Sequence, residues 1–158
     1  MDADLDRIPA TTSERAAWIA AVLTPLTAIG YFAVVLPQLG GQPVADIGWQ
    51  APMLWSMGIN FLGTIVVTII ATIIAGIGAG LRREELDTSS DERDREIDRH
   101  GGRVALAVAA AGLLVALVLA MLEADPFWIG NAAFLLGAAG ATAGAIAQVR
   151  AYRGTFRG

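Results

Sequence analysis

The stretch Ser89–Arg103 reads S-S-D-E-R-D-R-E-I-D-R-H-G-G-R and is the one long polar run in an otherwise apolar chain. It is preceded by two hydrophobic segments and followed by two, at about residues 16–36, 54–81, 104–122 and 127–149. A helix of about 20 residues crosses the ~30 Å hydrocarbon layer of a membrane. The pattern therefore predicts an all-α integral membrane four-helix bundle, built from two transmembrane hairpins. We expect a single transmembrane domain over residues 1–158, with a cytoplasmic charged loop at 82–103.

Composition supports a membrane protein and gives no sign of an enzyme. Apolar residues make up 55% of the 158 residues and charged residues 16%, with a mean hydropathy of +0.57, whereas soluble domains carry about 25% charged residues. The chain has no cysteine, which excludes disulfides and thiolate metal sites. No nucleophile with a base, phosphate-binding loop or buried carboxylate pair is visible. We expect a non-enzymatic protein without cofactor, metal or nucleic-acid partner.

Arginine placement predicts the orientation in the membrane. Lys and Arg together number 11, and all of them are arginine. In a four-span arrangement every arginine falls in the N-terminal segment, the central loop or the tail, and none in the two outer loops. Since positive residues gather in cytoplasmic loops, both termini and the central loop should be cytoplasmic. The residues are Arg7, Arg15, Arg82, Arg83, Arg93, Arg95, Arg99, Arg103, Arg150, Arg153 and Arg157.

Two short motifs predict where helices begin. Thr11 and Glu14 have the spacing of a capping box, which predicts a helix starting near residue 12. Asp125 suits an N-cap and Pro126 suits the first helical position, directly after a very short outer turn. A turn this short makes the third and fourth segments antiparallel neighbours.

The charged run itself has two interpretations. Its charge spacing predicts a short surface helix over about Asp91–Arg99, followed by a hinge at Gly101-Gly102. It is either a solvated linker whose arginines meet anionic lipid head groups, or a docking surface for a partner. Its nearly balanced charge differs from a polybasic nucleic-acid patch. The candidate docking residues are Asp91, Glu92, Arg93, Asp94, Arg95, Glu96, Ile97, Asp98 and Arg99.

The second span carries a polar residue every four positions: Ser56, Asn60, Thr64, Thr68 and Thr72. Four residues advance a helix by 400°, so this row stays on about half of the helix surface. It is either a packing seam between helices or a polar lining for a solute path. No carboxylate lies within the spans, which weakens a transporter. Asn60 and Asn131, the deepest amides, could meet near the outer side.

Small residues line the third and fourth spans. The fourth contains G-x-x-x-G from Gly140 to Gly144, a motif that permits close helix contact, either within the bundle or between copies. The other small residues follow one face of each span: Ala105, Ala109, Gly112, Ala116, Ala120 and Gly137.

The central loop D-E-R-D-R-E-I resembles a motif in small uncharacterised bacterial four-span integral membrane proteins. In those proteins an Asp-Glu-Arg element and an isoleucine follow the second span, and the matching residues here are Asp91, Glu92, Arg93 and Ile97. The rest of the chain is similar only as hydrophobic helix. The resemblance implies a multi-pass protein of the bacterial cytoplasmic (inner) membrane and supplies no activity.

These observations lead to three functional hypotheses. The first is an accessory or regulatory subunit, or a homo-oligomer, that acts through protein contacts with the charged loop as docking surface. Its partners would be the lipid bilayer and either a second copy or another membrane protein. The second is a small oligomeric channel or transporter lined by the polar row. The third is a sensor in which the Gly101-Gly102 hinge moves the charged helix.

Overall fold

The computed structural model describes residues 11–82 and 92–154, which form four long helices and two short 3-10 turns with no strand. All four long helices are long and apolar enough to cross a membrane. The predicted all-α fold is confirmed, and four candidate transmembrane helices indicate a multi-pass membrane protein. The elements are α1 (Thr12–Val35), η1 (Leu36–Gly40), η2 (Val44–Asp46), α2 (Gln50–Arg82), α3 (Glu92–Met121) and α4 (Pro126–Arg153).

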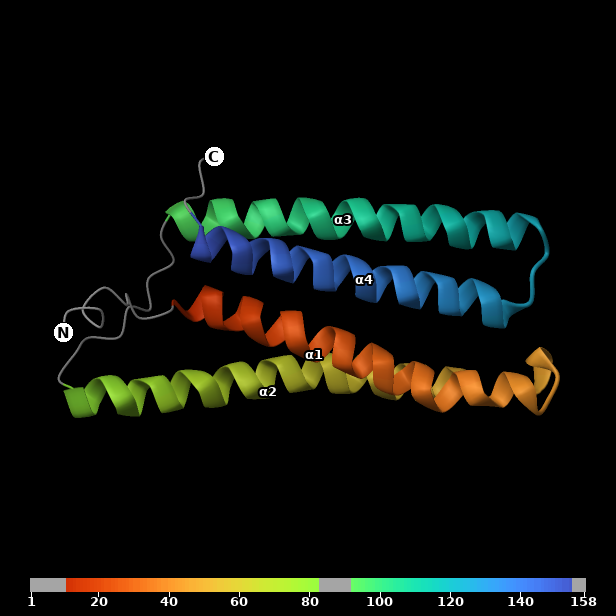
Figure 1. Ribbon diagram of the computed structural model, residues 1–158, viewed down its shortest axis with the longest axis horizontal. Helices are drawn as coiled ribbons and strands as arrows, with labels where there is room; N and C mark the ends of the chain where they lie inside the picture. Colours follow the sequence, from red (N-terminus) through yellow and green to blue (C-terminus); the bar gives the residue numbers. More distant parts are fainter. Residues whose placement is uncertain (1–10, 83–91, 155–158) are drawn as a thin grey trace.

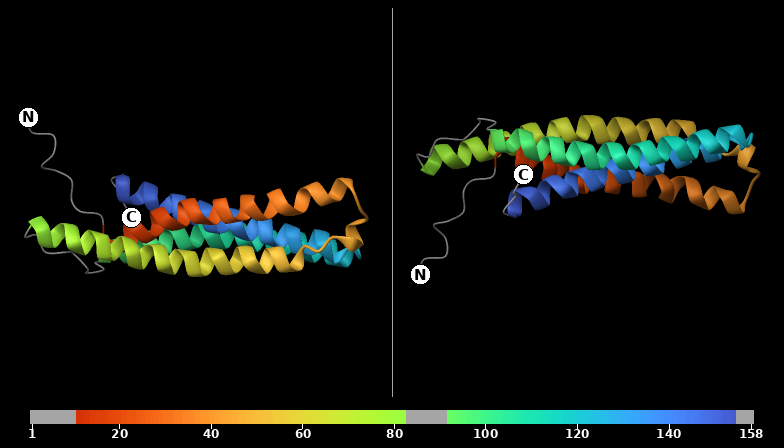
Figure 2. Two further views of the ribbon diagram at one scale, coloured as in Figure 1. Left: turned by 90° about the horizontal axis from the view of Figure 1, so that it is seen from below. Right: turned by 90° about the horizontal axis from the view of Figure 1, so that it is seen from above.

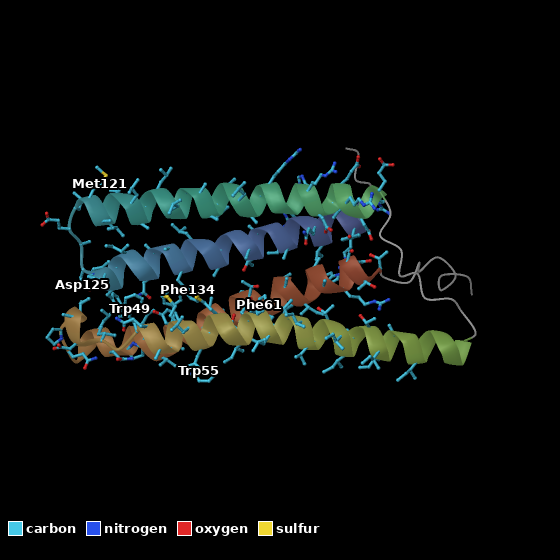
Figure 3. All side chains as sticks on the ribbon, turned by 180° about the vertical axis from the view of Figure 1, so that it is seen from behind. Trp49, Trp55, Phe61, Met121, Asp125 and Phe134 are labelled. Carbon is cyan, nitrogen blue, oxygen red and sulfur yellow. The ribbon has the colours of Figure 1, made fainter. Side chains whose placement is uncertain are left out.

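The four helices lie along one common direction, as two antiparallel pairs (Figures 1 and 2). Within each pair α1 packs against α2 and α3 packs against α4, and the two pairs meet where α1 packs against α4. The packing order is therefore α2–α1–α4–α3, with α2 held mainly by α1. Most large apolar side chains of α2 are exposed, Trp55 among them, and in Figure 3 Trp55 points away from the other helices. Such a surface suits a lipid environment.

Both predicted helix starts are confirmed. The Thr11 hydroxyl accepts a hydrogen bond from the Glu14 amide at 3.2 Å, and α1 begins at Thr12. The Asp125 carboxylate accepts from the Phe127 amide at 2.8 Å, with Pro126 in the first turn of α4. These caps satisfy amides that have no partner inside the helix.

The prediction of a separate charged helix and a glycine hinge is wrong. One continuous helix, α3, starts at Glu92 and runs through Gly101-Gly102 to Met121. The reason is packing: a β-carbon at Gly101 would lie only 2.8 Å from the Gly144 carbonyl oxygen. The missing side chain thus lets α4 approach and does not loosen the backbone. Asp91, the first residue of the predicted helix, lies outside the described residues.

The G-x-x-x-G motif makes its close contact within the chain, between α3 and α4. A β-carbon at Gly140 would lie 2.8 Å from the Ala105 carbonyl oxygen, and one at Gly144 would lie 2.7 Å from the Gly101 carbonyl oxygen. Both oxygens belong to the backbone and cannot swing away. The two helices are therefore closer than any larger residue would allow at these positions.

Candidate docking surface and intramembrane polar contacts

The first turns of α3, residues 92–100, form an extension beyond the predicted third span, here called the α3 extension. Its burial follows the helical period. Asp94 is 3% exposed and Ile97 is 0% exposed, and buried Gly101 continues this face. Residues three and four apart share one side of a helix. The α3 extension is therefore packed on one side and open on the other.

The buried side of the α3 extension faces α4, at the end of the molecule where α1 begins and α4 ends. The Tyr152 side chain on α4 faces Asp94 and Ser13. Burial, reinforced by the Asp94 carboxylate, raises the pKa of Tyr152, which lies outside the predicted spans. Close by, the Arg153 guanidinium lies 4.3 Å from the centre of the Trp18 ring. The α3 extension thus packs against the end of α4, which in turn contacts the start of α1.

The open side of the α3 extension presents charges of both signs. The Asp98 carboxylate accepts a long 3.5 Å hydrogen bond from the Gln148 amide. Burial, and then the nearby Asp94 charge, raises the pKa of Asp98. Of the nine candidate docking residues, Asp94 and Ile97 are buried and Asp91 is outside the described part. The exposed ones are Glu92, Arg93, Arg95, Glu96, Asp98 and Arg99.

The polar row of α2 makes two contacts with α1. The Ser56 hydroxyl donates to the Thr27 carbonyl oxygen at 2.9 Å, and the Asn60 amide donates to the Thr27 hydroxyl at 3.0 Å. The Thr64 hydroxyl donates to the Asn60 carbonyl oxygen within α2. These bonds join the first hairpin across its interface.

The other two threonines of the row are half-buried. The Thr72 hydroxyl donates to the Thr68 carbonyl oxygen at 2.8 Å, so this bond too stays within α2. Only the first part of the row, at Ser56 and Asn60, reaches a neighbouring helix through a hydrogen bond among the described residues. This pattern is typical of a packing seam between helices, in which threonine hydroxyls bond to carbonyl oxygens of their own helix.

Beside this seam lies a groove of about 320 Å³ between α1, α2 and α4. Its polar lining comes from Thr24, Thr27, Ser56 and Asn60, and small residues such as Gly137 line the α4 side. The groove is the part of the α1–α2 interface where the hydroxyl and amide groups approach α4.

The two deep amides do not meet each other. Asn131 accepts a 2.7 Å hydrogen bond from the Tyr31 hydroxyl and donates to the Phe127 carbonyl oxygen at 2.8 Å. Asn60 bonds Thr27 instead. The expected Asn60–Asn131 meeting is therefore wrong, because each amide finds a partner on α1 at its own depth. The bond of Tyr31 to Asn131 has no signal in the sequence, where Tyr31 is only an aromatic residue near a predicted helix end.

The end of the molecule where α4 begins is closed by a buried apolar cluster around this bond. Tyr31, Val35, Ile47 and Phe127 are all buried. Trp49 packs edge-on against Phe127, with ring centres 6.3 Å apart, and lies at that end of the molecule in Figure 3. The loop between α1 and α2 thus packs onto the start of α4.

Within residues 11–82 and 92–154 no three His, Asp or Glu side chains are grouped closely enough to hold a metal ion. His100 is exposed and lies on the α3 extension.

The fold and contacts define a protein with four candidate transmembrane helices arranged as two packed hairpins. Comparisons with family models, with curated proteins and with solved structures found no match. The function is therefore inferred from the residues of the chain itself.

Proposed function

We propose that the chain is a non-enzymatic integral membrane protein that acts through protein contacts, as an accessory or regulatory subunit or a homo-oligomer. The exposed side of the α3 extension is the docking surface. The observation that carries this proposal is the division of that helix into a buried side at Asp94 and Ile97 and a charged outer side.

A fixed helix is a better docking element than a free loop. Ordering a flexible backbone costs roughly 1–2 kcal/mol per residue, and an extension already packed on α4 avoids that cost when a partner binds. Mixed charges favour one partner orientation over others, because like charges brought together are unfavourable. Arg93, Arg95 and Glu96 supply both signs within a single helical turn.

The proposed location is the bacterial cytoplasmic (inner) membrane, with the α3 extension in the cytoplasm. The Trp18–Arg153 contact brings the start of α1 and the end of α4 together at the end of the molecule where α3 begins. The arginines of the described residues thus gather at this end, which supports a cytoplasmic side by the positive-inside rule. They include Arg15, Arg93, Arg95, Arg99, Arg103, Arg150 and Arg153.

The test is the mass of the complex extracted from native membranes in mild detergent. Neutralising Arg93, Arg95 and Glu96 together as glutamine should reduce the extracted species to the mass of a smaller complex or a monomer. Glu123→Gln is the matched control, since Glu123 is exposed at the opposite end of α3. An unchanged mass for the triple variant would refute docking through this surface.

A second candidate function, a small oligomeric channel or transporter lined by the α2 polar row, is favoured by one observation. The groove beside α1 and α4 carries the Ser56 and Asn60 side chains. If it conducts a solute, Asn60→Leu should abolish flux into proteoliposomes, while Thr72→Val, outside the groove lining, should not. Equal flux in both variants would remove this candidate.

A further inference from the structure

A second groove, of about 550 Å³, lies on the surface of α3 and α4 at the end carrying the α3 extension. Its lining residues come from these two helices and from Gly154 directly after α4. Two of them are basic or titratable, His100 and Arg150, and the apolar ones include Val104, Ala143, Ile146 and Ala147. The groove therefore has one polar end and an apolar floor.

The two ends of the groove correspond to different depths in the proposed membrane arrangement. His100 precedes the predicted third span, which begins at residue 104, and Arg150 directly follows the predicted fourth span, which ends at residue 149. The apolar floor lies within the spans. The polar end thus falls at the level of lipid head groups and the floor at the level of acyl chains.

One nearby carboxylate, that of Asp98, does not share this side of the helix pair. Asp98 precedes His100 by two residues, and Gln148, its hydrogen-bond partner, precedes Arg150 by two. Two residues rotate a helix by about 200°, so the Asp98–Gln148 pair lies across the α3–α4 contact from the groove. Glu96 lies four residues before His100 on the same helix face, but it does not line the groove. The charged or titratable side chains of the lining are therefore Arg150 and His100.

We propose that this groove binds one anionic glycerophospholipid, with its phosphate beside Arg150 and His100 and an acyl chain along Val104, Ile146 and Ala147. The inference rests on the proposed orientation but not on partner docking, because Arg93, Arg95 and Glu96 are not among the residues that line the groove. Basic pockets between transmembrane helices on the cytoplasmic side suit acidic head groups. The small side chains of Ala143 and Ala147 leave room for the chain.

The test is native mass spectrometry of the purified full chain in mild detergent, titrated with phosphatidylglycerol or with phosphatidylcholine of the same acyl chains. The wild type should retain phosphatidylglycerol more tightly than phosphatidylcholine. Arg150→Gln should weaken phosphatidylglycerol binding about fivefold, the effect of one basic side chain near a head group, and leave phosphatidylcholine unchanged. Arg103→Gln is the matched control, because Arg103 is exposed near the same depth and does not line the groove.

A second variant tests the apolar floor. Ala147→Leu should weaken both lipids by filling the space for the chain, while the helical circular dichroism signal stays that of the wild type. An excess of inorganic phosphate should not displace the lipid, since phosphate has no acyl chain. Equal loss in Arg150→Gln and Arg103→Gln, equal retention of the two lipids by the wild type, or displacement by inorganic phosphate would each overturn the proposal.

Discussion

Replacing Gly140 by alanine should weaken the contact between α3 and α4. A β-carbon there would lie 2.8 Å from the Ala105 carbonyl oxygen and 3.2 Å from the Ala109 amide nitrogen. Ordinary carbon–oxygen contacts are about 3.3–3.6 Å, so α3 must move by roughly half an ångström. Because the obstructing atoms are backbone, no side-chain rotation relieves them.

The magnitude follows from a comparison with Gly137 on the same helix. A β-carbon at Gly137 would meet nothing within 4 Å. The preference of a helix for alanine over glycine, about 1 kcal/mol in water, is common to both substitutions and cancels in their difference. Overpacking typically costs 1–3 kcal/mol. We therefore expect Gly140→Ala to be about 1–3 kcal/mol less stable than Gly137→Ala.

The assay is equilibrium unfolding in mixed micelles with increasing denaturing detergent, followed by tryptophan fluorescence and circular dichroism. Wild type and both variants are measured at one protein-to-detergent ratio, and the free energies of unfolding are compared. If Gly140→Ala were as stable as Gly137→Ala, the close α3–α4 contact would not exist as described.

Three further predictions concern the polar contacts. Tyr31→Phe leaves the buried Asn131 oxygen without its 2.7 Å donor and should lower the free energy of unfolding by about 1–3 kcal/mol, measured in the same assay; an unchanged value would contradict the bond. Asn60→Ala removes one hydrogen bond to Thr27 and should lower the free energy of unfolding by only about 0.6 kcal/mol, the average for such bonds in membranes. A decrease several times larger would contradict the loss of a single hydrogen bond. The pKa of Asp98 is raised in the fold, so the folded state binds the Asp98 proton more tightly than the unfolded state. This stabilisation is present at low pH and is lost as the pH rises through the raised pKa. Asp98→Asn should therefore raise the melting temperature at pH 7, with the gain disappearing below the ordinary carboxyl pKa of about 3.9; a gain equal at both pH values would refute this.

Local features of the fold were predictable from the sequence because their causes are local. The caps at Thr11 and Asp125 depend on residues within three positions of each other, and both were predicted correctly. The G-x-x-x-G motif indicated a close contact but not its partner. Whether Gly140 meets another helix of the same chain or of a second copy depends on the packing order, which the sequence pattern does not contain.

The errors arose where packing changes the role of a residue. Gly101 resembles a hinge when only its neighbours in sequence are considered, yet it lies against α4 because it has no side chain. Asp94 resembles any other charge in the run, although its spacing from Ile97 and Gly101 marks one helix face. The Tyr31–Asn131 hydrogen bond joins residues 100 positions apart, so it can be identified only from the folded structure.

If the packed α3 extension presents a docking surface, site-specific photo-crosslinking in native membranes should detect the partner there. A photoreactive amino acid in place of Arg95 should give one discrete protein adduct, identified by mass spectrometry, whereas the same group in place of Leu113, which is 71% exposed within the third span, should not give that adduct. Ile97→Asp, which disrupts the buried side and keeps the exposed charges, should abolish the adduct at position 95. No protein adduct at position 95, or one that persists in Ile97→Asp, would contradict docking through the α3 extension.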